Sequence, residues 1–244
     1  MLEIDHNAYG FKWKTIWFSE HPYDIIGYDG VIFRQCSKNT VLEGFLKQEF
    51  TTLIIDLTKT KNELWENMSK SSCRYAINRA EKDGVTIKMN QGYELFYDLN
   101  SNFRALKDIS RYDVDIEYMK KHCTLFMAES DGDLLGGQLY LNDHDHFRWL
   151  LGASNRLASS DKKTLIGNAN KMMIWEAILH AKDNDKKIFD MGGYYTGKNK
   201  DSQMEGINRF KKSFGGELTM YYHYQKDYSK IFALLKRMYN LCNG

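Results

Sequence analysis

The stretch from Leu165 to Gly216 constrains the fold of this chain more than any other. It begins with small and amide side chains, continues as an apolar pattern of helical period, and reaches a short apolar run that ends in Asp190-Met-Gly-Gly. Met172, Trp175 and Leu179 recur at i, i+3 and i+7, which predicts a helix with these residues on its buried face. A helix followed by a strand that ends in a glycine turn predicts an α/β protein with a ligand site at that strand end.

The start of this helix predicts an anion site. Gly167, Asn168 and Asn170 are expected to open the helix, where backbone N–H groups have no partner within the helix and the helix dipole is positive. Lys162 and Lys163 immediately before it add positive charge. An ordinary capped helix is the alternative.

The order of these motifs resembles the C-terminal half of the GNAT-fold acyltransferases, and more closely their FemABX-like branch. In that branch a helix leads to a strand with an Asp-x-Gly-Gly-type turn and then to a Phe-Lys-x-x-Phe-Gly motif, which here is Phe210 to Gly215. A second stretch, residues 53–87, resembles the strand of that branch and its helix with an arginine-containing run, here Arg74 to Val85.

This resemblance implies an α/β (α+β) protein with a GNAT-like fold, in which mixed central sheets are flanked by helices. We expect two GNAT-like halves: an abbreviated one over residues 1–110, and one over residues 111–244 that carries the acyl-donor site. The single proline and the lack of Gly/Ser-rich linkers argue against loosely tethered domains.

Composition narrows the class of protein. Of the 244 residues 43% are hydrophobic and 14% aromatic, which argues against disorder. The 34 basic and 32 acidic side chains give a net charge of only +2, so a DNA-binding protein is not expected. No signal peptide and no apolar run of about 20 residues is visible, and four cysteines without paired spacing predict reduced thiols. These features predict a cytoplasmic protein without a membrane span.

Further elements follow from local patterns. Aromatic and β-branched runs predict strands over residues 11–19, 30–37 and 51–58, and a meander of three strands over residues 123–155. A helix is expected over residues 61–82 with Thr58 as its cap, and another at the C-terminus through Tyr239. The run Asp143-His-Asp-His146 falls at a predicted hairpin turn, so we interpret it as a turn and expect no metal site.

The GNAT resemblance also implies a coenzyme A site. That family binds the diphosphate with Arg or Gln, two residues, Gly, one residue, then Gly or Ala, and here Thr replaces the first position. The preceding strand would pair with the pantetheine arm, beside a glycine suited to a bulge. The candidate cofactor-binding residues are Leu151, Gly152, Lys162, Lys163, Thr164, Gly167, Asn168 and Ala169.

Asp190 is the first candidate for the acceptor side, because a carboxylate at a strand end can hold or deprotonate an ammonium group. The alternative is a carboxylate that bonds the backbone of its own turn. Lys211 corresponds by motif to the lysine that FemABX-like enzymes place beside the reacting carbonyl, where an ammonium stabilises an oxyanion. Its alternative is a surface lysine on a helix whose other face is buried.

Other candidates follow from the same resemblance. Tyr194 or Tyr195 would donate a proton to the leaving thiolate, as tyrosine does in many GNAT enzymes, with ordinary packing as the alternative. The candidate substrate-binding residues are Arg74, Arg79, Gly192 and Gly193. For the two arginines, whose guanidinium groups suit diphosphates, a solvated helix face is the alternative.

The sequence therefore predicts an N-acyltransferase that moves an acyl group from acyl-CoA to the amine of a nucleotide-linked amino sugar, by direct attack, for surface polysaccharide biosynthesis. One alternative is a FemABX-like aminoacyl-tRNA-dependent transferase that acts on a peptidoglycan precursor. Another is a non-catalytic GNAT-like module that binds a nucleotide sugar or a partner. The expected partners are small-molecule substrates.

Overall fold

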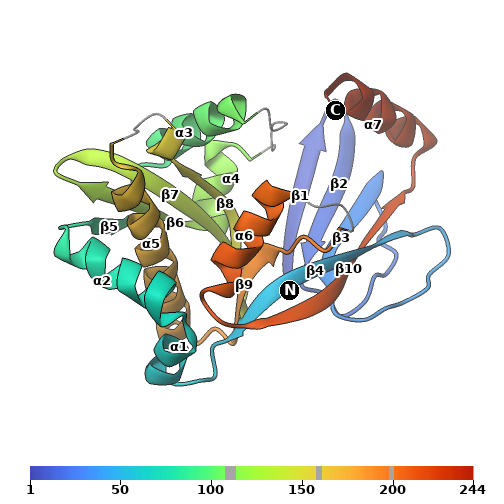
Figure 1. The fold of residues 1–244 in the computed structure, drawn as a ribbon. Helices are drawn as coiled ribbons and strands as arrows, with labels where there is room; N and C mark the ends of the chain where they lie inside the picture. Colours follow the sequence, from blue (N-terminus) through green and yellow to red (C-terminus); the bar gives the residue numbers. More distant parts are fainter. Residues whose placement is uncertain (108–113, 158–160, 198–200, 244) are drawn as a thin grey trace. The chain divides into compact units, whose positions relative to one another are not determined.

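The computed structural model describes residues 1–107, 114–157, 161–197 and 201–243 (Figure 1). The chain divides into two compact units, residues 1–52 with 218–244 and residues 53–217. Two long strands, β4 (Leu46–Asp56) and β10 (Glu217–Asp227), run from one unit into the other along the chain. The boundary expected near residue 110 lies inside the second unit, and the interpretation as two GNAT-like halves stays a prediction.

The first unit is built on β1 (Leu2–Ala8), β2 (Phe11–Trp17), β3 (Gly30–Cys36) and β10, followed by helix α7 (Lys230–Asn243). β1 and β2 form an antiparallel hairpin, β2 runs parallel to β3, and β3 pairs antiparallel with β10. β1 was not expected from the sequence, since its Leu-Glu-Ile-Asp-His-Asn-Ala run has few β-branched or aromatic residues. The strands expected over residues 11–19 and 30–37 are confirmed.

The second unit contains the strand order β4-β9-β8-β7-β6-β5. Its further strands are β5 (Thr86–Met89), β6 (Cys123–Ser130), β7 (Asp133–Asn142), β8 (His146–Ser154) and β9 (Ile188–Gly193). β5 to β8 pair antiparallel, which confirms the expected meander, whereas β8 and β9 are parallel. A parallel pair needs a crossover between its strands, and the long helix α5 (Lys163–Asp183) supplies it.

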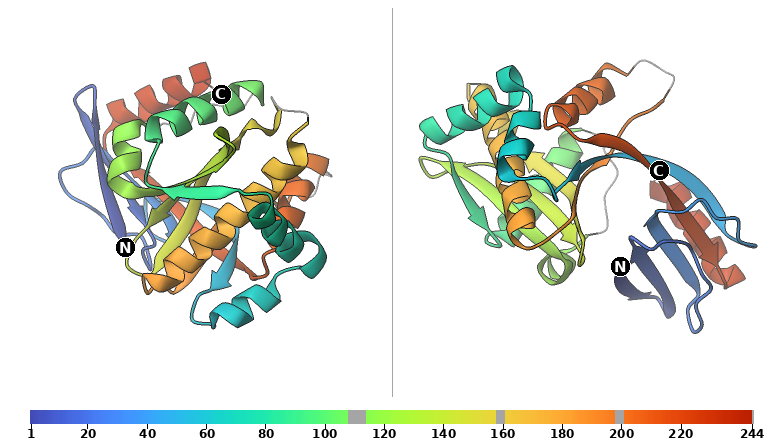
Figure 2. Two further views of the ribbon diagram at one scale, coloured as in Figure 1. Left: turned by 90° about the vertical axis from the view of Figure 1, so that its left-hand side faces the viewer. Right: turned by 90° about the horizontal axis from the view of Figure 1, so that it is seen from below.

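Helices cover both faces of this sheet (Figure 2). They are α1 (Lys61–Asn67), α2 (Tyr75–Lys82), α3 (Tyr93–Leu106), α4 (Ile116–His122), α5 and α6 (Ser202–Lys212). In the left view of Figure 2, α3 and α4 lie on one side of the strands, and α2 and α5 lie on the other. The sheet is therefore mixed and flanked by helices, as expected.

The buried face of α5 differs from the expected one. The expected residues, Met172, Trp175 and Leu179, are only partly buried. The fully buried positions of the helix are Ile166, Ala169, Met173, Ile174, Ala177, Ile178 and Ala181. These positions also recur with helical period, and their three alanines allow close approach of neighbouring elements. The choice of face was wrong because α5 is apolar over much of its circumference, so periodicity alone does not select the buried side.

The prediction of a single helix over residues 61–82 is wrong, because the helix is interrupted between α1 and α2. α1 ends at Asn67, Met68 is extended with φ −76° and ψ 146°, and a π-helical turn over Lys70–Arg74 precedes α2. The expected cap is wrong as well. Thr58 bonds Asp56, whereas Thr60 caps α1: its hydroxyl accepts from the backbone N–H of Glu63 and its own N–H donates to the Glu63 carboxylate. This reciprocal pair is a capping box.

Composition led to two expectations that the structure bears on: the state of the cysteines and the presence of a membrane-spanning helix. Cys36, Cys73 and Cys123 are buried free thiols, and burial raises the pKa of Cys123 to about 12. Of the helices in the described part of the chain, none has both the length and the apolar character needed to cross a bilayer.

The capping box gives a first test. We expect Thr60→Ala to lower the free energy of unfolding by about 1 kcal/mol, because the N–H of Glu63 loses its acceptor. Thr60→Ser keeps the hydroxyl and is the matched control, with a loss well below that of the alanine variant. Chemical denaturation measures both, and equal losses in the two variants would show that the cap is not the cause.

Candidate functional site

A cavity of about 850 Å³ lies in the second unit, where β8 and β9 stop pairing. The register of the two strands ends with Arg148 opposite Asp190. Beyond this pair, residues 149–154 of β8 and residues 191–193 at the end of β9 line the cavity. α6 contributes a further wall with Gly206, Ile207, Phe210 and Lys211.

A buried ion pair between Arg148 and Asp190 lies where the pairing of β8 with β9 ends. One Nη of Arg148 lies 2.7 Å from Oδ2 of Asp190, and the carboxylate is only 1% exposed. The other oxygen, Oδ1, accepts the backbone N–H of Gly192 at 2.7 Å. Gly192 has φ +75°, and a Cβ there would lie 3.2 Å from the carbonyl oxygen of Trp149, so glycine suits both the conformation and the close approach.

β8 carries a bulge at the cavity. Leu139 of β7 pairs with Leu151 and Tyr140 pairs with Trp149, which leaves Leu150 as the extra residue. The indole N–H of Trp149 donates to the carbonyl oxygen of Leu151 at 2.8 Å. A Cβ on Gly152 would lie 2.8 Å from the indole ring, so this glycine makes room for the tryptophan. The bulge lies at Leu150, two residues before Gly152, which itself pairs with Gln138 of β7.

Lys211 reaches the cavity from α6 and is 7% exposed. Its Nζ donates to the carbonyl oxygen of Gly193 at 2.5 Å and lies 5.8 Å from the centre of the Trp149 ring. Burial, together with the nearby charge of Arg148, lowers the pKa of Lys211 to about 8, while the Asp190 carboxylate acts in the opposite direction. At neutral pH the site therefore holds an ammonium that loses its proton more readily than an ordinary lysine.

The cavity lining is basic. Its described residues include the cations Lys107, Arg148, Arg156, Lys163 and Lys211, and among them there is no Asp or Glu. Lys107, Arg156 and Lys163 form no ion pair with any residue that the structure describes. A concave site with cations and no carboxylate on its described wall favours an anionic ligand.

Six predicted site residues meet in this cavity: Leu151, Gly152, Lys163, Gly192, Gly193 and Lys211. The other predicted residues are not part of its described lining: Asp190, Tyr194, Tyr195, Lys162, Thr164, Gly167, Asn168, Ala169, Arg74 and Arg79. Sequence reasoning missed Lys107, Arg148 and Arg156, which come from three separate segments. Of these three residues, only Arg148 could have been noticed from its own segment, because it is a charged residue in the mostly apolar strand β8.

The expectation that Gly167 opens the long helix is wrong. α5 begins at Lys163, and the N–H of Ile166 already donates to the carbonyl oxygen of Lys162. The N–H groups of Gly167 and Asn168 therefore fall within the helical hydrogen-bond ladder, and Ala169 is buried. The N–H groups without helical partners belong to the first turn, with Lys163 and Thr164, both exposed. Residues 159 and 160 of the expected phosphate loop lie outside the described residues.

The remaining predicted residues make local contacts. Lys162 pairs with Asp133 at the start of β7. Arg74 pairs with Glu66 at 2.6 Å, and Arg79 pairs with Asp83 at 2.9 Å. Their proposed roles with substrate stay predictions.

The two tyrosines after β9 are partly buried. The backbone of Tyr195 exchanges two hydrogen bonds with the side-chain amide of Asn208, at 3.1 and 2.8 Å. Tyr194 packs against the core of the second unit, with Nζ of Lys212 5.7 Å from its ring centre. Their assignment as proton donors stays a prediction. Asp190 makes the contacts of the alternative weighed for it, since it bonds the backbone of its own turn.

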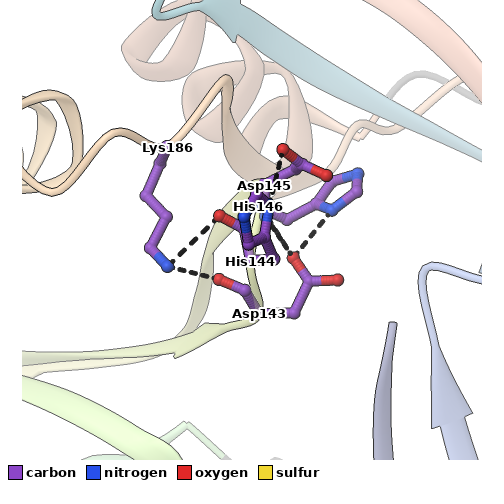
Figure 3. Close-up of polar contacts among 5 residues, drawn as sticks. All are labelled: Asp143, His144, Asp145, His146 and Lys186. Carbon is purple, nitrogen blue, oxygen red and sulfur yellow. Dashed lines mark hydrogen bonds and ion pairs between the residues drawn. The ribbon is translucent and has the colours of Figure 1, made fainter.

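The run from Asp143 to His146 is a turn between β7 and β8 (Figure 3). Oδ1 of Asp143 accepts the backbone N–H groups of Asp145 and His146 at 3.0 and 2.7 Å and lies 2.9 Å from Nδ1 of His146. The ammonium of Lys186 bonds the carbonyl oxygens of Asp143 and His144. The turn interpretation is confirmed. Within the described residues, no group of three or more His, Cys, Asp or Glu side chains is arranged for a metal ion.

Comparisons with known proteins bear on the fold. No family model matches the chain, and no curated protein matches its sequence. Among solved structures it is similar to FemX, with a TM-score of 0.61 and 15% identity over 86% of this chain and 74% of that one. The fold is FemX-like.

Two more structures share this fold. L-PGS from Bacillus licheniformis has a TM-score of 0.58 and 14% identity, over 88% of this chain and 73% of that chain. The C-terminal domain of a putative lysylphosphatidylglycerol synthetase from Agrobacterium fabrum has a TM-score of 0.57 and 13% identity, over 86% of this chain and 70% of that chain. These likenesses confirm the expected GNAT-like, FemABX-like fold, and at such identities they show the fold alone.

Lys211 gives a second test, on stability. Its pKa falls from 10.5 to about 8 on burial, so between these values the unfolded chain binds a proton at this site that the folded chain does not. As the pH rises from about 7 to about 11, the free energy of unfolding of the unchanged protein should therefore increase by about 3 kcal/mol relative to that of Lys211→Met. Denaturation at a series of pH values measures this difference. Lys212→Met, at the exposed neighbouring position, is the control. The same pH dependence in both variants would contradict the burial argument.

Proposed function

We propose that this chain is an N-acyltransferase whose reaction takes place in the cavity beside Lys211. The donor is an acyl thioester of coenzyme A, and the acceptor is the amine of a nucleotide-linked amino sugar of surface polysaccharide biosynthesis. The amine attacks the thioester carbonyl directly: a C–N bond forms, the C–S bond breaks, and the amine loses one proton while the thiolate gains one. The observation that carries the proposal is a buried lysine in a basic cavity at the point where two parallel strands separate.

Lys211 is the catalytic residue in this proposal. Its ammonium, fixed by the carbonyl oxygen of Gly193, stabilises the oxyanion of the tetrahedral intermediate. A pKa of about 8 also suits it to protonate the leaving thiolate, because an acid works best when its pKa is near the working pH. We assign this proton transfer to Lys211 because Tyr194 and Tyr195 are not part of the described lining.

Asp190 is a positioning residue in this proposal. Both of its oxygens are engaged, one by Arg148 and one by the N–H of Gly192, and it is almost completely buried. A carboxylate in this setting is poorly placed to take a proton from an acceptor amine. It instead holds Arg148 and favours the charged form of Lys211.

The remaining cations suit phosphate groups of the two substrates. Lys107, Arg156 and Lys163 line the cavity without an acidic partner among the residues described, and Lys163 belongs to the first turn of α5, where N–H groups are unpaired. Coenzyme A and a nucleotide sugar each carry a diphosphate. Beyond Arg148 the described register of β8 with β9 stops, and in this proposal the pantetheine arm runs along β8 beside Leu151 and Gly152.

The likeness to FemX favours a second candidate, an aminoacyl-tRNA-dependent transferase that acts on a peptidoglycan precursor. The same chemistry applies, with an ester oxygen in place of the thiolate as the leaving group. The cations of the cavity suit the phosphates at the acceptor end of a tRNA equally well. Binding and turnover experiments decide between coenzyme A and aminoacyl-tRNA as the donor.

Adjacent lysines provide a test of donor binding. Lys163 lines the cavity, whereas Lys162 pairs with Asp133 outside it. We expect coenzyme A at about 100 times its Kd to raise the melting temperature by about 5–10 °C. Lys163→Ala should weaken this binding about tenfold, because a charge-assisted contact to phosphate is lost, and Lys162→Ala should leave it unchanged.

The other outcomes of this test are informative. No shift with coenzyme A, together with turnover of an aminoacyl-tRNA, would replace the first candidate by the second. A shift only with a nucleotide sugar, and no turnover with either donor, would favour a non-catalytic binding module.

Turnover tests the role of Lys211. With the donor that binds, Lys211→Met should lower kcat by about 10²–10³-fold with little change in KM, because the interaction is made with the oxyanion. Asp190→Asn should have a smaller effect and shift the pH profile to lower pH, since a charge that favours the ammonium is removed. Full activity in both folded variants would refute the assignment of the site.

A further inference from the structure

Helix α7 of the first unit presents an uncovered apolar face. Its exposed large apolar residues recur at i, i+3, i+4 and i+7, so they lie on one side of the helix. They are 45–66% exposed and form what we term the α7 stripe: Ile231, Leu234, Leu235 and Met238. Exposed apolar side chains are ordinary when scattered, whereas a contiguous stripe marks a surface of interaction.

A different side of the same helix is attached to the unit. The ring of Phe232 lies 5.6 Å from that of Phe11 and 5.7 Å from that of Trp13. Nζ of Lys236 lies 3.1 Å from a carboxylate oxygen of Asp227. The helix is therefore held by its own packing, and the α7 stripe is a second face that this packing leaves uncovered.

All charged side chains of α7 are basic. The helix contains Lys230, Lys236 and Arg237, and its sequence has no Asp or Glu. Lys236 pairs with Asp227, while Lys230 and Arg237 are exposed and lie by helical spacing along one border of the stripe. An apolar face bordered by basic residues is typical of helices that lie in the surface of an anionic bilayer.

Two loops beside α7 add apolar tips. Tyr9 is 99% exposed at the turn between β1 and β2, two residues before Phe11, which contacts Phe232. Ile26 is 97% exposed in the segment before β3, and the carbonyl oxygen of Asp29 in that segment accepts the N–H groups of Tyr228 and Ser229 immediately before α7.

We infer that the α7 stripe, with Tyr9 and Ile26, is a docking surface for an anionic lipid bilayer. The apolar side chains enter the acyl boundary, and Lys230 and Arg237 meet the lipid phosphates. A second copy of this chain fits the surface less well, because a stable dimer uses about 20–30 residues on each side. A helix-binding groove of another protein would cover α7 alone and leave the two loop tips unused.

Vesicle sedimentation tests this inference. The unchanged protein should sediment with vesicles of phosphatidylcholine and phosphatidylglycerol, bind vesicles of phosphatidylcholine alone more weakly, and lose affinity as salt is raised. Leu234→Asp should weaken binding to the mixed vesicles at least about tenfold, since one buried leucine is lost. Arg237→Gln should weaken it about fivefold, the share of one basic residue.

Leu95→Asp is the matched control, because Leu95 is a leucine of similar exposure on α3 of the other unit. It should bind as the unchanged protein does, and circular dichroism verifies the folding of every variant. Absence of sedimentation with the mixed vesicles would overturn the inference, as would equal binding by Leu234→Asp. A dimer in solution that Leu234→Asp dissociates, without vesicle binding, would assign the surface to a second copy and also overturn it.

Discussion

The ion pair between Arg148 and Asp190 is the interaction on which the candidate site depends. The two residues are register partners on parallel strands, and their side chains meet where that register ends. Taking both charges out of water is costly, and the second hydrogen bond of Asp190, from the N–H of Gly192, offsets part of that cost. Oδ1 of Asp190 accepts the N–H of Gly192, which fixes the turn at the end of β9, where the backbone passes close to the carbonyl oxygen of Trp149 beside the cavity.

The same pair sets the electrostatics of the cavity. Lys211 lies close enough to both charges that one lowers its pKa and the other raises it, on top of the larger effect of burial. Perturbed lysine pKa values of this kind cluster at functional sites. The FemX-like fold provides the frame, and the proposed chemistry comes from these side chains.

Local motifs were predictable from the sequence, and long-range partners were not. Asp190 at a strand end and Lys211 in its Phe-Lys-x-x-Phe-Gly motif could be named as candidates because each motif lies in one continuous segment. Arg148 was missed because its role depends on a register with a residue 42 positions away. The helix start was misplaced because glycine and asparagine favour helix ends, whereas α5 already begins at Lys163. The break before α2 was also missed, since Met68 is apolar and local propensity gives no sign of its extended backbone.

The division of the chain into units has a consequence for biosynthesis. Residues 53–217 form one unit from a continuous segment, whereas the other unit combines residues 1–52 with residues 218–244. During translation the continuous unit is complete before β10 has left the ribosome, so its cavity can form first. β3 gains its partner only when β10 has been made, and until then the edge of β3 is unpaired and open to aggregation.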